Sequence, residues 1–319
     1  MDKKRHNFSI VFGGAGFIGS HLCRRLLGRG DEVLCVDNMS TGRFENIHPM
    51  LRQYGFKFLY HDVAVPIPES VSGIERVDNI YNLACAASPV YYQVDSVHTL
   101  ATSVVGSLNI LNLARSKGAK VLLASTSEVY GDPQVSPQSE DYWGNVNPNG
   151  VRSCYDEGKR AAETLFCDFH RMYGTDTRIV RIFNTYGPCM SPEDGRVVPT
   201  FINQALAGEP LTVNGDGSQT RSLMYIDDLI DGIMRVMDAP IPAMPVNLGN
   251  PEEMTVNELA SLIVGLTGST STVVHRPLPP DDPRRRCPDI SLAKRILDGW
   301  YPKIPLAEGL KKTIQSFRK

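Results

Sequence analysis

The chain has 319 residues, of which 42% are hydrophobic and 21% charged, and its formal net charge is −2. This length can bury a large core and hold two lobes, while the small net charge leaves no basic excess to bind nucleic acid or a membrane surface. We therefore expect a globular protein that acts on a small polar substrate.

The chain begins with a short basic segment, MDKKRHNFS, and glycines interrupt the apolar run that follows it. That run is too short for a signal sequence or a membrane span, so we expect a cytoplasmic protein. The seven cysteines form no C-x-x-C pair. Neither a disulfide framework nor a zinc site is therefore expected, and no metal is predicted.

Residues 8–30, FSIVFGGAGFIGSHLCRRLLGRG, predict a buried strand, a glycine-rich turn and an amphipathic helix. Two spacings fit the turn: Gly14, Gly16 and Gly19 match G-x-G-x-x-G, and Gly13, Gly16 and Gly19 match G-x-x-G-x-x-G. Either spacing lets the backbone approach a pyrophosphate at the helix N-terminus. The segment therefore predicts a dinucleotide-binding unit.

A second predicted strand, EVLCVD, ends at Asp37, about 20 residues after the glycine turn. A carboxylate there would accept hydrogen bonds from the adenosine ribose hydroxyls and would repel a 2′-phosphate. NAD is therefore favoured over NADP. We expect the nearby Arg43 to be a surface residue or a lesser contact.

Strands and helices continue to alternate through residue 125, which predicts a parallel, doubly wound α/β sheet of the Rossmann type. The third strand, FKFLYHDV, brings Asp62 and Val63 to its carboxyl edge, although such an Asp is more often a turn cap. The fourth, within VDNIYNLACAASP, leads into small residues that would approach the cofactor or simply pack. A long helix over 96–117 and a strand, AKVLLAS, follow.

The strand that ends at Ser125 and Thr126 is followed by Glu128, and a helix from 154 to 173 carries Tyr155 and Lys159 four residues apart. That spacing puts the phenol and the ammonium on one helix face. We predict that the cation lowers the pKa of Tyr155, which could then exchange a proton with a sugar hydroxyl. The alternative is a partly buried ring beside a solvated amine.

The second half departs from the regular alternation and predicts a smaller substrate lobe built from interspersed pieces. A long loop over 131–152 should either cover the site or be mobile. We expect residues 1–183 to form the NAD-binding domain, with segments near 220–250 returning to it, and 184–319 to be mainly the substrate lobe. Arg284, Arg285 and Arg286 form a basic run that is either a solvated loop or a diphosphate contact.

The motifs GGAGFIGSHL, STSEVYGDP, SEDYWG, YDEGKR, RIFNTYGP, DGRVV, GSQTRS and NLGNPEE occur in this order. The sequence thereby resembles the extended short-chain dehydrogenase/reductase family, and within it the UDP-glucuronate decarboxylases, over almost the whole chain. In the related 4,6-dehydratases an Asp stands at the place of Ser127. The resemblance implies that NAD oxidises C4 of UDP-glucuronate, that carbon dioxide leaves, and that re-reduction gives UDP-xylose.

The resemblance also implies roles for individual residues. Tyr155 moves the proton beside Lys159, Thr126 bonds the C4 oxygen, Glu128 positions the ring or handles the C5 proton, and Arg286 meets the carboxylate. The implied cofactor contacts are Gly13, Gly16, Phe17, Ile18, Gly19, Asp37, Asn38, Thr41, Asp62, Val63, Leu83, Ala84, Cys85, Thr102, Tyr155, Lys159, Thr185 and Arg196. The implied UDP-sugar contacts are Asn184, Arg221, Tyr225 and Arg286, with Arg196 near the diphosphate.

The helices over 96–117 and 154–173 carry apolar residues beyond one stripe, at Leu108, Leu111, Leu165 and Phe169. A helix that is apolar on two faces needs a second partner. By resemblance these helices pair across a two-fold axis, so we expect a homodimer.

Three residues depart from the family's pattern: Phe12 before the glycine turn, Ala101 in place of a common Lys, and Cys287 after Arg286. The missing cation at Ala101 makes release of UDP-4-keto-xylose an alternative outcome. A UDP-glucuronate 4-epimerase is the nearest other enzyme, and a non-catalytic NAD sensor is the remaining class.

Overall fold

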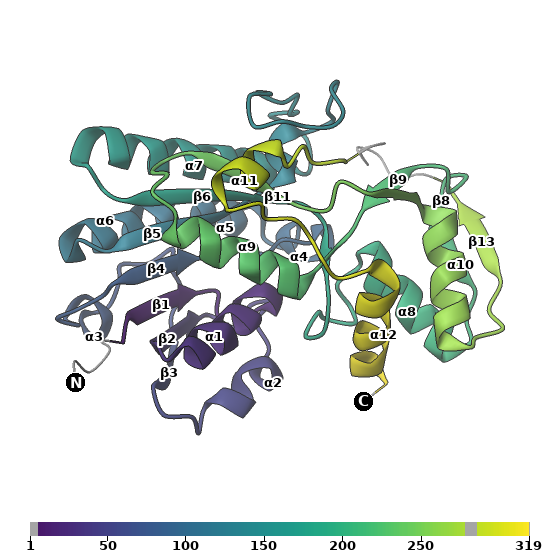
Figure 1. The fold of residues 1–319 in the computed structure, drawn as a ribbon, viewed down its shortest axis with the longest axis horizontal. Helices are drawn as coiled ribbons and strands as arrows, with labels where there is room; N and C mark the ends of the chain where they lie inside the picture. Colours follow the sequence, from purple (N-terminus) through teal and green to yellow (C-terminus); the bar gives the residue numbers. More distant parts are fainter. Residues whose placement is uncertain (1–5, 278–285, 319) are drawn as a thin grey trace.

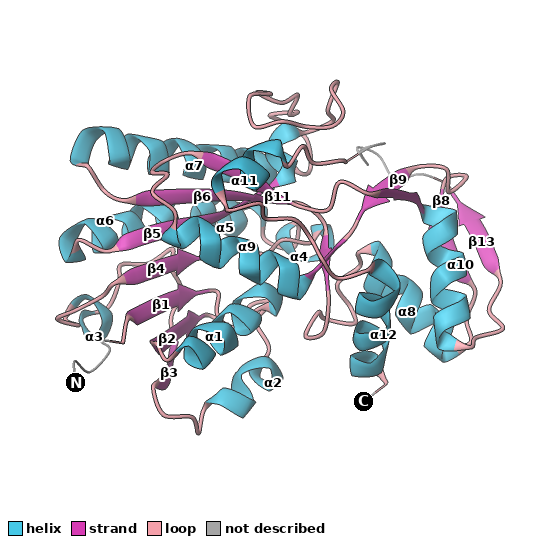
Figure 2. Cartoon of the chain, in the orientation of Figure 1, coloured by secondary structure: helices cyan, strands magenta, loops and turns pink. Residues whose placement is uncertain are grey.

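A computed structural model describes residues 6–277 and 286–318 of the chain. Its centre is a seven-stranded parallel sheet with the order β11-β6-β5-β4-β1-β2-β3 (Figures 1 and 2). This confirms the predicted doubly wound α/β fold. The strands are β1 Phe8–Phe12, β2 Glu32–Asp37, β3 Phe56–Tyr60, β4 Asn79–Asn82, β5 Lys120–Thr126, β6 Thr177–Ile182 and β11 Pro245–Leu248.

Side chains alternate between the two faces of the sheet and so enter two cores. In β1, Val11 lies in the core that includes residues of α1 (Phe17–Arg29) and α9 (Ile226–Asp238). Its neighbours Ile10 and Phe12 lie in the core that includes residues of α6 (Ser107–Lys117) and α7 (Ser153–Tyr173). Both faces are therefore covered, as the near-continuous apolar strands require. Phe12, one of the departures from the family pattern, is fully buried.

The predicted helix over 96–117 is one continuous helical stretch with a local change of winding. It consists of α5 (Ser96–Ala101), a π-helical turn over Thr102–Gly106 and α6. Gly106 packs so closely on Val63 that a Cβ there would lie 2.6 Å from Val63 Cγ2. By length and hydropathy alone the stretch could cross a membrane, but half of its apolar window is buried inside the protein, as in a core helix.

A smaller lobe lies beside the carboxyl ends of the sheet strands (Figure 1). It carries three two-stranded sheets, β10–β7, β12–β9 and β13–β8. Residues 226–248 leave this region and return to the main sheet as α9 and β11. The lobe's elements are β7 Thr185–Tyr186, α8 Val197–Ala207, β8 Leu211–Asn214, β9 Thr220–Ser222, β10 Met224–Tyr225, β12 Glu253–Thr255, α10 Val256–Thr267, β13 Val273–Arg276 and α12 Leu306–Phe317.

Short helical segments connect the main elements. The loop over 131–152 has no helix and no named strand, as predicted. The short segments are α2 Phe44–Ile47, η1 His48–Met50, α3 Glu69–Ser72, α4 Pro89–Tyr92, η3 Ser127–Tyr130 and α11 Ser291–Ile296.

A buried ion pair fixes α7 to the sheet. Arg181 of β6 donates from Nη2 to Glu163 Oε2 at 2.7 Å, and the two side chains are only 12% and 11% exposed. Ser125 of β5 donates to the other carboxylate oxygen at 2.5 Å. The Ser125 hydroxyl therefore holds the helix that carries Tyr155.

We expect Glu163→Gln to lower the free energy of unfolding by about 3 kcal/mol, because it leaves a buried guanidinium without its counter-charge. Urea denaturation measures the change. Asp168→Asn on the same helix is the control: its partner Arg171 is 66% exposed, so the loss should stay below about 1 kcal/mol. Equal losses for the two variants would contradict this assignment.

Candidate active site

A cavity of about 710 Å³ lies at the carboxyl ends of the parallel strands and extends to the smaller lobe. In an open parallel sheet this edge is where ligands bind. All but two of the predicted site residues line the cavity; Asp62 and Tyr225 do not. Arg284 and Arg285 lie outside the described residues.

The glycine turn after β1 forms one wall of the cavity and leaves no room for side chains. Gly13 has φ +77°, and a Cβ on Gly19 would lie 2.1 Å from Gly13 O. The helix that follows, α1, has Gly16 as its N-cap and no side-chain capping bond. Its first N–H groups are thus available to an anion, and the turn fits a dinucleotide pyrophosphate.

The carboxylate of Asp37 lies at the end of β2, beside the glycine turn. It accepts hydrogen bonds from the backbone N–H of Ala15 at 2.9 Å and of Met39 at 2.8 Å. Burial raises its pKa although these bonds oppose the shift. The position fits the adenosine ribose of NAD. Arg43 also lines the cavity. Of the two predictions for Arg43, this favours a minor contact with the cofactor over a surface residue without contact.

Asp62 stabilises the turn after β3 through hydrogen bonds and does not line the cavity. Its carboxylate accepts hydrogen bonds from Asn38 Nδ2, His98 Nε2 and the backbone N–H of Ala64, each at 2.8 Å. Val63 beside it does line the cavity, as do Asn38, Thr41, Leu83, Ala84, Cys85 and Thr102. The Thr102 hydroxyl is buried without a hydrogen-bond partner among the described residues.

Tyr155 and Lys159 lie together in the first turns of α7, but the predicted fall in the pKa of Tyr155 is wrong for this structure. Burial raises the pKa of the phenol well above its usual range, while a hydrogen bond with Thr126 opposes the shift. Lys159 donates from Nζ to Ala124 O at 2.9 Å and lies 5.9 Å from the Tyr155 ring centroid. Burial also lowers the pKa of Lys159, so the ammonium does not offset the desolvation of the phenol.

Glu128 is held between two arginines at the same end of the cavity. Arg286 binds both of its oxygens, with Nη1 to Oε1 at 2.6 Å and Nη2 to Oε2 at 2.7 Å. Arg152 donates from Nη2 to Oε2 at 2.5 Å. Burial raises the pKa of Glu128, but Arg286 and Arg152 more than offset this and lower it overall. The carboxylate is therefore ionised.

The sequence reasoning did not single out Tyr92, Arg152 or Asp156, which surround this ion cluster. Tyr92 stacks on Tyr155 with ring centroids 5.0 Å apart and an interplanar angle of 2°. Asp156 is buried beside Tyr155. Arg152 and Asp156 are four residues apart at the start of α7, a spacing that could have predicted a shared helix face.

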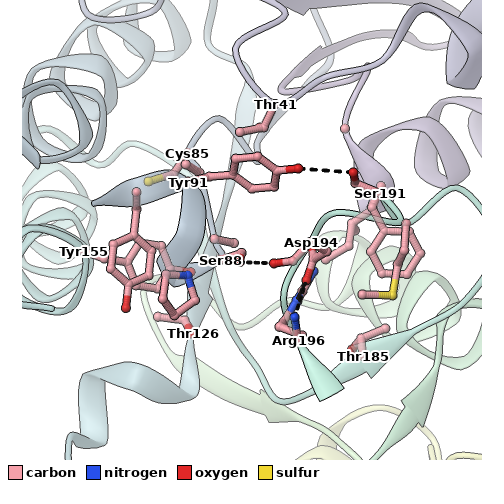
Figure 3. A pocket seen from close by; sticks show the side chains of 18 of the residues that line it. Thr41, Cys85, Ser88, Tyr91, Thr126, Tyr155, Thr185, Ser191, Asp194 and Arg196 are labelled. Atoms are coloured by element: carbon pink, nitrogen blue, oxygen red, sulfur yellow. Dashed lines mark hydrogen bonds and ion pairs between the residues drawn. The ribbon is translucent and has the colours of Figure 1, made fainter. Parts of the chain in front are cut away.

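The opposite wall is tied to the segment after β4 by two polar contacts, and a third polar contact lies within that wall (Figure 3). Ser88 donates to the backbone oxygen of Asp194, Tyr91 Oη lies 3.2 Å from Ser191 Oγ, and Arg196 binds the Asp194 carboxylate. Figure 3 shows Tyr155 and Thr126 on one side and Arg196 and Thr185 on the other. The cavity thus separates the proton-transfer groups from a guanidinium.

Asn184, Arg221, Ser127 and Arg286 line the cavity. Tyr225 does not, because its ring packs edge-on against Tyr186, with centroids 5.7 Å apart, and β10 pairs with β7. The predicted substrate contact of Tyr225 therefore has no support in the structure.

The model of the NAD dependent epimerase/dehydratase family matches residues 9–249. The chain belongs to this NAD-dependent family, which confirms the predicted cofactor. Among solved structures, a UDP-glucose 4-epimerase from Thermotoga maritima in complex with UDP-glucose is 31% identical, with a TM-score of 0.88 and coverage of 98% of both chains.

Sequence similarity indicates the particular branch of the family. UDP-glucuronic acid decarboxylase 4 of Arabidopsis thaliana is 53% identical over 310 residues, which are 97% of this chain and 68% of the relative. A UDP-glucuronic acid 4-epimerase from Bacillus cereus, solved with UDP-glucuronic acid and NAD, has a TM-score of 0.86 but is only 26% identical, over 98% of this chain and 99% of its own. The predicted relationship to the decarboxylases is confirmed.

Gly19→Ala should weaken NAD binding by roughly tenfold or more, equivalent to about 1.4 kcal/mol, because the new Cβ forces Gly13 out of the turn. Calorimetric titration with NAD measures the change. Gly28→Ala in the same helix is the control, since a Cβ there meets no atom within 4 Å. If both variants bind NAD like the parent protein, the glycine turn does not hold the cofactor.

Proposed function

We propose that the protein is an NAD-dependent UDP-glucuronate decarboxylase that forms UDP-xylose. The observation that carries this proposal is the 53% identity to a UDP-glucuronic acid decarboxylase over 97% of the chain. The site supports it, because a buried tyrosine and a pair of guanidiniums meet at one end of a cavity whose other parts fit a dinucleotide. We assign the cofactor mainly to residues 1–183 and the UDP-sugar mainly to 184–319, with α9 and β11 completing the sheet.

The chain's own residues hold and move protons at C4 of the sugar. Bound NAD supplies the hydride acceptor and later the hydride donor at C4, and the positive charge of its oxidised ring favours the phenolate of Tyr155. Tyr155 takes the C4 hydroxyl proton and returns it at the end of the cycle. Thr126, which shares a hydrogen bond with Tyr155, donates to the C4 oxygen when that oxygen carries charge.

Oxidation at C4 leaves a ketone β to the C6 carboxylate, and such an acid loses carbon dioxide as its electrons pass to the C4 oxygen. Arg286 and Arg152 supply positive charge for the carboxylate, and Arg286 Nε is buried without a hydrogen-bond partner among the described residues. Glu128 keeps both guanidiniums in place. Because its carboxylate is ionised, it can orient a water molecule, and that water gives C5 the proton that it must gain.

A UDP-glucuronate 4-epimerase remains the second candidate, because the Bacillus cereus enzyme shares the fold over nearly the whole chain. It would use the same oxidation but keep the carboxylate. Release of UDP-4-keto-xylose would differ again, because NADH would accumulate. A sensor without turnover would need neither Tyr155 nor Lys159.

Incubation of the protein with UDP-glucuronate and NAD tests the proposal. We expect one carbon dioxide for each UDP-xylose formed, without lasting accumulation of NADH. Tyr155→Phe should still bind NAD and UDP-glucuronate but lose about 100- to 10,000-fold in rate, since the proton has no acceptor. UDP-galacturonate without carbon dioxide would instead identify an epimerase, and near-normal turnover of Tyr155→Phe would refute the role of Tyr155.

We further propose that the protein is a homodimer that acts in the cytoplasm. The helical stretch over 96–117 leaves apolar side chains in solvent, with Val97 80%, Leu100 42%, Val105 42% and Leu108 39% exposed. Such a patch on a helix favours a partner helix. Leu111 and Phe169 belong to the chain's own core, so they cannot provide the contact expected of them. All seven cysteines are thiols, which favours a reducing compartment.

Light scattering at micromolar concentration should give twice the chain mass of 35.2 kDa. Val97→Asp combined with Leu100→Asp should produce a monomer, because two charges would be buried at the interface. Tyr54→Asp, at a ring that is 98% exposed on another surface, should leave the dimer intact. A parent protein that is monomeric under these conditions would rule out this assembly.

A further inference from the structure

The carboxyl group of Asp156 is buried next to the site. Asp156 is 6% exposed, and its Oδ1 has no hydrogen-bond partner among the described residues. The Tyr92 hydroxyl is also buried without such a partner. A buried acceptor of this kind is costly, and a carboxylic acid reduces the cost by taking a proton.

Asp156 is placed next to the arginine cluster by the start of α7. Its backbone N–H donates to Arg152 O at 3.1 Å, which closes a helical turn and puts both side chains on one helix face. Arg152 in turn binds Glu128, which binds Arg286. The charged groups that shift the pKa of Asp156 are Glu128, Arg152, Arg286 and Glu157. The charge of Asp156 in turn raises the pKa of Tyr92, Cys154 and Tyr155.

The charge of this cluster depends on Asp156. Burial, together with Glu128, raises the pKa of Asp156 to about 7, although Arg152 and Arg286 oppose the shift. With Asp156 ionised, two guanidiniums face two carboxylates, and the cluster is neutral. With Asp156 protonated, the cluster carries one positive charge, which is what an incoming carboxylate requires.

We propose that Asp156 is a positioning residue that takes up a proton when the anionic C6 carboxylate of the sugar enters beside Arg152 and Arg286. It acts through the charge of these arginines, because Asp156 does not line the cavity. The inference rests on the proposed function, since it requires an anionic sugar. A neutral sugar on the same nucleotide would bind without this proton.

Linkage gives the direction of the pH dependence. The carboxylate raises the pKa of Asp156 further, so binding is strongest below that pKa and weakens as the pH rises above it. We expect the ratio of the Kd of UDP-glucuronate to that of UDP-xylose to rise about tenfold between pH 6 and pH 9 if the carboxylate raises the pKa by one unit. UDP-xylose is the matched ligand because it lacks only the carboxylate.

The experiment is isothermal titration of the NAD-loaded protein with both sugars, in buffers that differ in ionisation enthalpy. The Tyr155→Phe variant serves as the parent so that the sugar is not consumed. At pH 8 UDP-glucuronate should bind with about 0.4 proton more than UDP-xylose, and at pH 6 with about 0.1 or less. In Asp156→Asn the extra proton should vanish, and the ratio of dissociation constants should stay constant with pH.

Glu157→Gln removes a carboxylate from the next position, where the side chain is 38% exposed, and it should keep the extra proton. If the role of Asp156 were purely structural, Asp156→Asn would instead weaken the binding of both sugars equally at every pH. If that variant does not fold, Asp156→Ser provides a second neutral side chain. If UDP-glucuronate binds to the Tyr155→Phe protein without an extra proton, while the protein with Tyr155 releases carbon dioxide from it, the role of Asp156 is overturned and the proposed function stands. Absence of both binding and carbon dioxide overturns the proposed function.

Discussion

The burial of the Glu128 carboxylate between Arg152 and Arg286 is the constraint on which the site depends. An isolated carboxylate at this depth would lose several kcal/mol of hydration. Two guanidiniums at 2.5–2.7 Å offset the loss, and they come from the residue just before α7 and from the segment before α11. The cluster therefore ties the end of β5, the start of α7 and the second half of the chain together at the reacting end of the cavity.

Helix α7 is held at two levels by buried charge. Near its N-terminus Arg152 binds Glu128, and two turns beyond Tyr155 the carboxylate of Glu163 binds Ser125 and Arg181. Ser125 and Arg181 lie on β5 and β6, and Glu128 lies in the short helix η3 that directly follows β5. The positions of Tyr155 and Lys159 therefore follow from the sheet. The groups that move protons are thus placed mainly by the sheet, and the long loop over 131–152 contributes through its last residue, Arg152.

The sequence predicted those parts of the site that depend on the ends of parallel strands. Asp37 and Thr126 are the last residues of β2 and β5, the glycine turn follows β1, and the Tyr155 helix packs against β5 and β6, so the fold brings them together. Burial and packing decide the rest. Asp62 is used within its own turn, Tyr225 packs on Tyr186, and the pKa of Tyr155 is set by desolvation. No spacing in the sequence reveals how deeply such a side chain is buried.

Shape alone does not decide what happens to the carboxylate, because the 4-epimerase from Bacillus cereus shares the fold. A site that bound the carboxylate as tightly as possible would stabilise the ground state and slow the loss of carbon dioxide. Here Glu128 already occupies both terminal nitrogens of Arg286, so the incoming anion competes for a shared guanidinium. The negative charge is better stabilised on the C4 oxygen, beside Tyr155 and Thr126, than on the C6 carboxylate. This difference in stabilisation favours decarboxylation.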